Sequence, residues 1–245
     1  IKLTWNSSNS QAPRTIIYVV KELEADKLKT AKIEIEAEYK TSYITQNVVG
    51  IIEGSSISDS AIVLTAHYDH LGTLGNDVFF PGANSNAAGV AMLLSLAKHF
   101  EMIHPKYSII FIALGGEVQG LEGSKAYTNY PAIALSKTKF LINFDVIGTG
   151  IDGAKVVNGS ILEPQFKLLN DINTRNKYLS KLEPRGEACI SGHCMFHRKN
   201  VPCFSIYTMG GTVNYNNLDD TPENTPLTEF EDMYNLIIKF IERIK

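Results

Sequence analysis

The chain has 245 residues, of which 44% are hydrophobic and 20% charged, and its formal net charge is -3 from 23 basic and 26 acidic residues. This size and composition predict one globular domain spanning residues 1–245, long enough to bury a substantial core. Neither sign of charge forms a block, which argues against a nucleic-acid partner. No apolar run approaches the roughly 20 residues of a membrane span. The three cysteines cannot all pair within the chain, so the sequence leaves their redox state open.

The first predicted elements are a helix and two strands. Apolar residues at helical spacing predict an amphipathic helix from about Ala12 to Leu28. Alternating apolar and acidic residues from Ile33 to Tyr39 predict a half-exposed edge strand. The apolar, β-branched run from Asn47 to Glu53 predicts a more buried strand that pairs with it.

From Ser60 onward, buried apolar strands alternate with helices, which is typical of βαβ units in an α/β fold. The predicted elements are strand Ala61–Ala66, helix Ala87–Phe100, strand Ser108–Leu114, strand Lys139–Val146, strand Lys155–Val157, helix Glu163–Asn176, strand Cys203–Tyr207 and helix Thr228–Ile244. Because open α/β sheets bind ligands beyond the carboxyl ends of their strands, polar residues at those ends are the candidates for a site.

Three of the predicted strands end in such residues. The first is followed by His67, Asp69 and His70, the second by two glycines and Glu117, and the third ends in Asp145. A single histidine at a strand end is more often structural than functional. A histidine and several carboxylates that meet at one edge of a sheet are instead suited to a metal or catalytic site, with Glu117 as a general base.

Five motifs carry a resemblance to a known family. They are His-Tyr-Asp-His-Leu-Gly at 67–72, Gly-Ala-Asn-Ser-Asn-Ala-Ala-Gly at 82–89, Gly-Gly-Glu-Val-Gln-Gly-Leu-Glu-Gly-Ser at 115–124, Asn-Phe-Asp-Val-Ile-Gly at 143–148 and Asp-Asp-Thr at 219–221. In this order and spacing the chain resembles metallopeptidase family twenty-eight, which contains dizinc aminopeptidases and, more distantly, glutaminyl cyclases. The resemblance implies a single three-layer α/β domain, with a central mixed sheet and helices on both faces.

The resemblance also implies a metal site. In active members, five ligands hold two zinc ions that share a carboxylate, and a Glu beside them is the general base. Here His67 and Asp145 correspond to two of the ligands, Asp69 to the carboxylate that supports the histidine, and Glu117 to the general base.

The other three ligand positions depart from the family pattern. The shared carboxylate falls at Ser85, the second Glu at Val118 and the late histidine at Asn216. A serine hydroxyl is a poor zinc donor, valine has none, and an asparagine oxygen is uncharged. Only His67 and Asp145 then remain for one zinc, so the zinc expected from the family is predicted to be absent or weakly bound. The single zinc of the cyclases depends on the same three positions.

The remaining candidates lie near the predicted cleft. His70 and His193 are expected to line the pocket, and Gly192 replaces the Asp of an Asp-His pair that is usual in the family. A new metal site built from nearby side chains is a less favoured alternative, because their spacing is not diagnostic. That set is His70, His193, His197, Cys189 and Cys194. Asp219, Asp220 and Thr221 are expected to cap the last turn or helix.

Three functions stay open. The first is a homologue of zinc aminopeptidases that is impaired or inactive in catalysis and binds peptide ends or a small ligand in the old cleft. The second is an atypical metallo-exopeptidase that uses one metal at His67 and Asp145, with Glu117 as general base. The third is a protein-interaction domain with a vestigial cleft. The resemblance implies export to the periplasm or the extracellular space, while the oligomeric state is not predicted.

Overall fold

The computed structural model describes residues 29–30, 32, 42, 44–74 and 77–244. The predicted helix Ala12–Leu28 and strand Ile33–Tyr39 lie outside the described residues. The strands are β1 (Val48–Ile52), β2 (Ile57–His67), β3 (Gly72–Leu74), β4 (Val78–Phe80), β5 (Tyr107–Leu114), β6 (Thr138–Phe144), β7 (Ala154–Val157), β8 (Leu182–Arg185) and β9 (Cys203–Thr208). The longer helices are α1 (Ala88–Ile103), α2 (Glu122–Asn129), α3 (Glu163–Asn176) and α5 (Phe230–Arg243). Shorter helical segments are η2 (Ala83–Ala87), η3 (Leu135–Lys137), α4 (His193–His197) and η4 (Pro222–Asn224).

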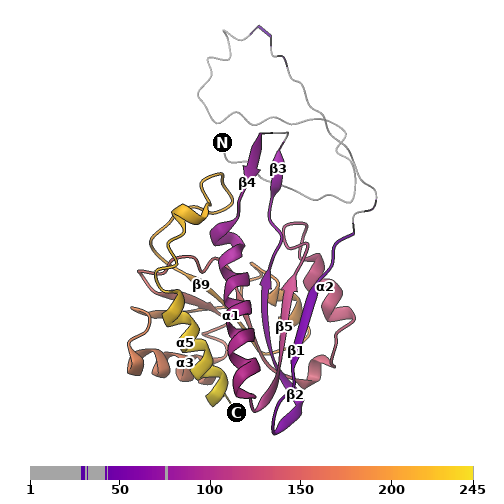
Figure 1. The fold of residues 1–245 in the computed structure, drawn as a ribbon, viewed down its shortest axis with the longest axis vertical. Helices are drawn as coiled ribbons and strands as arrows, with labels where there is room; N and C mark the ends of the chain where they lie inside the picture. The colour runs from indigo at the N-terminus through magenta and orange to yellow at the C-terminus, as the bar shows by residue number, and fades with distance from the viewer. Residues whose placement is uncertain (1–28, 31, 33–41, 43, 75–76, 245) are drawn as a thin grey trace.

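Within the described part of the chain, seven strands form one sheet in the order β1-β5-β2-β6-β9-β7-β8. Parallel pairs join β5, β2, β6 and β9, whereas β1 runs antiparallel to β5 and β7 antiparallel to β9. The mixed sheet predicted from the sequence is therefore confirmed. Strands β3 and β4 form a separate hairpin, which Figure 1 shows beyond the end of β2.

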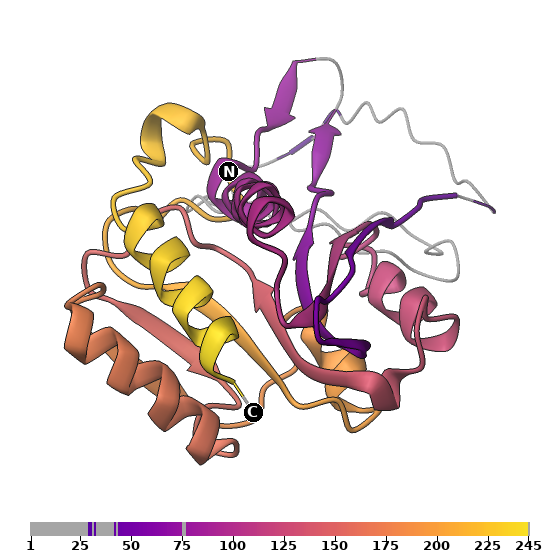
Figure 2. The same ribbon diagram turned by 60° about the horizontal axis from the view of Figure 1, so that its bottom comes forward.

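Helices cover both faces of the sheet (Figure 2). Along β2, Ile62 and Leu64 belong to the core beneath α1, α3 and α5. Their neighbours Ala61 and Val63 point to the opposite face, where they join a smaller core that includes residues of α2 and α4. This alternation follows from the two-residue period of a strand, and it gives the three-layer arrangement predicted from the sequence.

An aromatic cluster fixes the strands that carry the site. Phe140 of β6 packs edge to face against Phe204 of β9, with ring centres 4.9 Å apart, and against Phe240 of α5 at 5.6 Å. All three side chains are fully buried. Buried aromatic side chains contribute strongly to core stability, so β6 and β9 form a rigid base for the residues at their carboxyl ends.

Some predicted elements differ from the observed ones. The run Asn47–Glu53 was expected to be the more buried strand of a pair, but four of the five residues of β1 are exposed, because β1 lies at the edge of the sheet. The sequence did not predict the hairpin, α2, α4 or β8. Strand β8 contains Pro184 and buries only Leu182, so it lacks a strand-like pattern.

Among the described residues, none of the helices is both long enough and apolar enough to cross a membrane.

Candidate functional site

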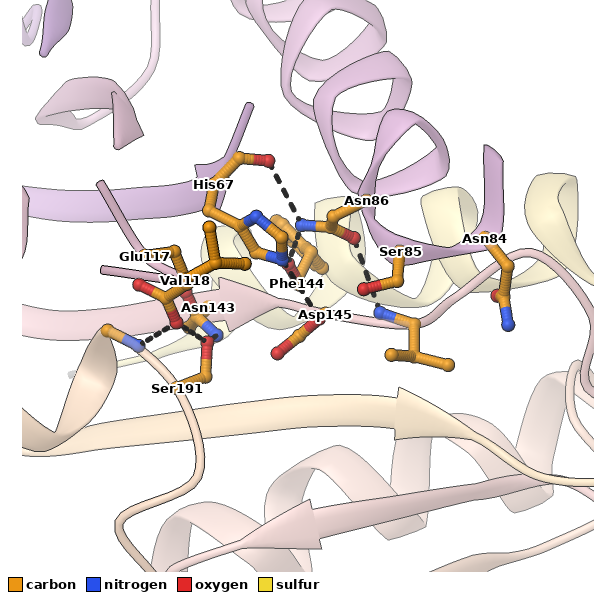
Figure 3. Close-up of polar contacts among 12 residues, drawn as sticks. His67, Asn84, Ser85, Asn86, Glu117, Val118, Asn143, Phe144, Asp145 and Ser191 are labelled. Atoms are coloured by element: carbon orange, nitrogen blue, oxygen red, sulfur yellow. Dashed lines mark hydrogen bonds and ion pairs between the residues drawn. The ribbon is translucent and has the colours of Figure 1, made fainter. Parts of the chain in front are cut away.

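The carboxyl ends of three neighbouring parallel strands bring the predicted site residues together (Figure 3). His67 is the last residue of β2, Glu117 follows β5 after two glycines, and Asp145 comes directly after β6. Parallel strands end at the same edge of a sheet, which explains why residues 28 to 78 positions apart in sequence meet here.

His67 lies at the centre of this group and is almost completely buried. Its Nδ1 lies 2.9 Å from the backbone oxygen of Asp69, and its Nε2 lies 3.4 Å from Asp145 Oδ1, an ion-pair contact that lacks hydrogen-bond geometry. Burial alone would lower the pKa of His67, but its contacts with Asp145 and Asp69 outweigh burial and raise that pKa to about 10. The imidazole is therefore held as a cation at neutral pH, and a carboxylate faces each of its two nitrogens.

Asp69 joins the end of β2 to the turn after β5. Its two carboxylate oxygens accept hydrogen bonds from the backbone N–H groups of Glu117, at 3.1 Å, and Val118, at 3.2 Å. Burial would raise the pKa of Asp69, but the contact with His67 and these N–H donors lower it below its ordinary value. Asp69 is thus held ionised, and it fixes the backbone of the turn that carries Glu117.

Glu117 is held on one side only. Its Oε1 accepts hydrogen bonds from Ser191 Oγ, at 2.7 Å, and from the backbone N–H of Gly192, at 2.8 Å. Its Oε2 is buried and has no hydrogen-bond partner. Burial raises the pKa of Glu117 from 4.5 to about 7. A carboxyl group in this state can accept or donate a proton near neutral pH, which is the property required of a general base.

A buried polar chain supports Glu117 from below, and sequence reasoning missed it. Thr65 Oγ1 donates to Asn143 Oδ1 at 2.8 Å, and Asn143 Nδ2 donates to the hydroxyls of Ser191, at 3.1 Å, and Ser205, at 3.0 Å. Because Ser191 Oγ accepts from Asn143, its own proton is directed to Glu117. The signal in the sequence was the presence of single polar residues inside apolar strand segments: Thr65 in β2, Asn143 in β6 and Ser205 in β9.

The raised pKa of Glu117 predicts a pH dependence of stability. A carboxyl whose folded pKa exceeds its unfolded value contributes stability that is complete below about pH 4.5 and is lost as the pH rises through 7. We expect Glu117→Gln, which mimics the protonated carboxyl, to remove this loss, which amounts to at most about 3 kcal/mol. Urea unfolding of both proteins at about pH 5 and about pH 8 measures it. His67 and Asp145 face residue 117 in both proteins. If the difference in unfolding free energy between the two proteins does not change with pH, the raised pKa of Glu117 is contradicted.

The turn before α1 carries Ser85, which the family resemblance aligns with the shared carboxylate. Ser85 is buried and is joined to Asn86 by a cis peptide bond. On its two sides, neutral amides tie the strand ends together. Asn86 Nδ2 donates to the backbone oxygens of His67, at 3.3 Å, and Phe144, at 2.9 Å. Asn84 Oδ1 accepts from the backbone N–H of Gly148 at 2.9 Å. The segment 84–86 therefore holds the site together through hydrogen bonds between neutral groups.

Asp220 holds this turn, contrary to the expectation that residues 219–221 cap the last turn or helix. The fully buried carboxylate of Asp220 accepts from the backbone N–H groups of Asn84, at 2.6 Å, and Ser85, at 3.1 Å. Thr221 begins η4 without a side-chain capping bond. The carboxylate instead caps a segment 135 residues earlier, where unpaired N–H groups lie in the interior and need an acceptor.

Val118 and Asn216 occupy the other two positions that the family resemblance assigns to metal ligands. Val118 follows Glu117 directly, and its N–H is bound by Asp69. Asn216 lies in the loop between β9 and η4, with a left-handed backbone φ of 53°. The same loop brings Tyr215, which the sequence did not single out, near the carboxylates. Burial, and then the negative charges of Asp145 and Glu117, raise the pKa of Tyr215.

The structure places the remaining histidines in separate environments. His70 packs its ring against Gly82, where a Cβ atom would lie 2.6 Å from Cγ of the ring, and both of its ring nitrogens lack hydrogen-bond partners. His193 is buried, and its Nε2 lies 3.0 Å from the backbone oxygen of Ala188. Burial lowers the pKa of His193 to about 4, so this ring is neutral. His197 lies 3.4 Å from Glu187.

A disulfide between Cys189 and Cys194 takes both thiols out of the alternative metal set. The sequence had left the pairing of the three cysteines open, and Cys203 is the buried, unpaired one. In the part of the chain that the structure describes, no group of three or more His, Cys, Asp or Glu side chains is arranged to hold a metal ion.

The side chains present do not fit a pair of zinc ions. His67 Nε2 and Asp145 Oδ1, at 3.4 Å, have the separation of two ligands on one tetrahedral zinc, which is roughly 3.3 Å. A catalytic zinc normally has three protein ligands, however, and the positions that the family resemblance assigns to the further ligands hold Ser85, Val118 and Asn216. Ser85, at the position that the resemblance gives to the shared ligand, has no carboxylate.

Comparison with known proteins identifies the family and the fold of this chain. Residues 47–241 match the model of peptidase family M28, and the chain belongs to this family. This chain is 28% identical over 167 residues to aminopeptidase YwaD of Bacillus subtilis, and the match covers 67% of this chain and 35% of that protein. It is 36% identical over 113 residues to a probable zinc metalloprotease of Pyricularia oryzae, which covers 44% and 22%. The matches thus span about a third or less of these relatives.

Solved structures show the same fold. A zinc aminopeptidase from Bacillus subtilis has a TM-score of 0.67 at 22% identity, covering 80% of this chain and 49% of that one. A leucine aminopeptidase precursor from Bacteroides thetaiotaomicron has a TM-score of 0.68 at 18% identity, covering 81% and 77%. A glutaminyl cyclase from an Acidobacteriales bacterium has a TM-score of 0.66 at 20% identity, covering 81% and 73%.

Proposed function

We propose that this M28 family member is not a peptidase and that its strand-end site binds, without metal, a ligand carrying a protonated amine, such as the amino end of a peptide. The observation that supports this most directly is a pair of partly buried carboxylates at the strand ends, each with one buried oxygen. Glu117 Oε2 has no hydrogen-bond partner, and Asp145 Oδ1 has only its ion-pair contact with His67. A buried acceptor without a partner is costly, and an ammonium group would supply both charge and donors.

The net charge of the strand-end site favours the binding of a cationic ligand. His67 contributes one positive charge, while Asp69 and Asp145 contribute two negative charges. Glu117 adds a further negative charge whenever it is ionised. The cluster is therefore net negative, and two protein ligands are too few for firm zinc binding. An organic cation satisfies the same oxygens without needing a complete set of ligands.

The test compares leucinamide with N-acetyl-leucinamide, which has the same side chain but no ammonium group. We expect the free amine to shift the backbone amide signals of Val118 and Gly192 and to bind at least about tenfold more tightly than the acetylated form. Asp145→Asn should remove this preference. Asp171→Asn, which deletes an equal charge in an exposed pair on α3, should retain it. Equal binding of the two compounds, or no binding of either, would contradict the proposal.

Two other functions make different predictions. An active exopeptidase with one metal at His67 and Asp145 would show zinc-dependent hydrolysis that Glu117→Gln abolishes. An interaction domain with a vestigial cleft would bind a protein partner equally well with or without Asp145→Asn. Stoichiometric zinc together with aminopeptidase turnover would overturn the binding proposal outright.

We further propose that the protein works in an oxidising compartment outside the cytoplasm, as the family resemblance implied. The Cys189–Cys194 disulfide supports this, because such bonds are rare in the cytosol of most organisms. Thiol titration of the denatured, unreduced native protein should detect only Cys203; detection of all three thiols would contradict it.

A further inference from the structure

We propose that the Cys189–Cys194 disulfide is a redox-sensitive clamp that positions the Glu117 carboxylate. The disulfide joins the two ends of a short loop, and Ser191 and Gly192 lie between its cysteines. These two residues provide both hydrogen bonds that the Glu117 carboxylate accepts, at 2.7 and 2.8 Å. The disulfide therefore constrains the loop whose hydrogen bonds hold Glu117 Oε1 in place.

Two polar contacts also hold the same loop closed. His193 Nε2 contacts the backbone oxygen of Ala188 at 3.0 Å, and the backbone N–H of Cys194 donates to the oxygen of Ser191 at 3.0 Å. The loop lacks regular structure until α4 begins at His193. Without the disulfide, its geometry would depend on these few hydrogen bonds, each of which has a modest net strength.

The position of the disulfide allows it to be opened while the domain stays folded. Cys189 is exposed, whereas Cys194 is buried. A dithiol reductant can attack the Cys189 sulfur, form a mixed disulfide and expel the Cys194 thiolate, which then takes up a proton. The second thiol of the reagent closes its own ring and releases Cys189. In total, two electrons and two protons pass from the reagent to the protein.

The loop is also fitted to Glu117 by shape. Gly192 is buried, and a Cβ atom there would lie 2.7 Å from Leu114 Cδ1 and 3.3 Å from Glu117 Oε2. The absence of a side chain lets the Gly192 N–H approach the carboxylate closely. Loosening the loop therefore affects Glu117 before it affects the apolar core, since the strands beneath are held by their own buried contacts.

The test is hydrogen exchange of the Gly192 amide, which needs no ligand and is thus independent of the function proposed above. We expect a dithiol to accelerate this exchange at least about tenfold and reoxidation to reverse it. The Leu141 amide, which donates to Pro202 inside the sheet, should change little. The double variant Cys189→Ser with Cys194→Ser should resemble the reduced protein; if it does not fold, reduction of the folded wild type still decides the question.

The variant Glu117→Ala tests whether the disulfide acts on Glu117 or only stabilises the loop in general. With its acceptor removed, the Gly192 amide should exchange rapidly even with the disulfide closed, and reduction should add little. Full acceleration by reduction in Glu117→Ala would show that the disulfide does not act through Glu117. Unchanged Gly192 protection in the reduced wild type, or equal acceleration at Leu141, would overturn the proposal.

Discussion

Ser85→Asp is expected to raise the zinc content of the purified protein from well below one ion to about one ion per chain, because a third ligand would join His67 and Asp145. Adding Val118→Glu and Asn216→His should raise it to about two ions, since these positions serve only the second metal. Elemental analysis after incubation with zinc and dialysis measures both steps. The graded result follows from the shared carboxylate, whose loss weakens both metal positions while the other two losses affect one.

The variants also predict a change in stability. Without metal, Ser85→Asp adds a carboxylate to a buried cluster that already holds Asp145 and Glu117, so it should lower the melting temperature. Zinc should then raise the melting temperature of Ser85→Asp but not that of the wild type. Ser85→Asn is the matched control, because it adds similar volume without charge and should bind no zinc. Two zinc ions in the wild type would show that the ligand assignment is wrong, and one would favour the single-metal exopeptidase.

Asp220→Ala is expected to destabilise the fold by about 3 kcal/mol or more, because it leaves the N–H groups of Asn84 and Ser85 buried without an acceptor. For a domain of this size, the melting temperature should fall by roughly 10 °C. Asp219→Ala is the control. Asp219 is the neighbouring residue and is exposed, so its replacement should change the free energy of unfolding by no more than about 0.5 kcal/mol.

Asp220→Asn refines this result. An amide can offer one oxygen to one of the two N–H groups, so this variant should lie between Asp220→Ala and the wild type. Equal stability of Asp220→Ala and Asp219→Ala in urea unfolding would mean that the two short contacts contribute nothing. In that case, something other than this cap would hold the loop carrying Asn216 against the turn carrying Ser85.

Apolar runs in the sequence predicted the central strands and thereby the edge where His67, Glu117 and Asp145 meet. Burial on both faces makes parallel strands continuously apolar, so they are easy to identify. The strands and helices with a weaker pattern were missed. The α2 helix has few apolar residues, and the hairpin strands β3 and β4 are three residues each.

The polar support of the site was the least predictable part. Asp220 reaches across 136 residues to Asn84, and Asn143 connects three segments through its one amide. Such contacts depend on the tertiary fold and leave no periodic trace in the sequence. The disulfide was equally hidden, since three cysteines allow several pairings and only the fold brings Cys189 and Cys194 within 5.0 Å between Cα atoms.

The packing around Gly192 limits which substitutions this site can accept, and in which order. At Ser85 and Val118 a return to the family residue exchanges one side chain for another. At residue 192 the family resemblance implies an Asp, yet any Cβ atom there would lie 2.7 Å from Leu114 Cδ1, in a fully buried residue at the end of β5. The Asp could return only after Leu114 had moved or become smaller. Packing, rather than metal chemistry, thus makes any change at residue 192 depend on a prior change at Leu114, and it imposes an order on substitutions in this site.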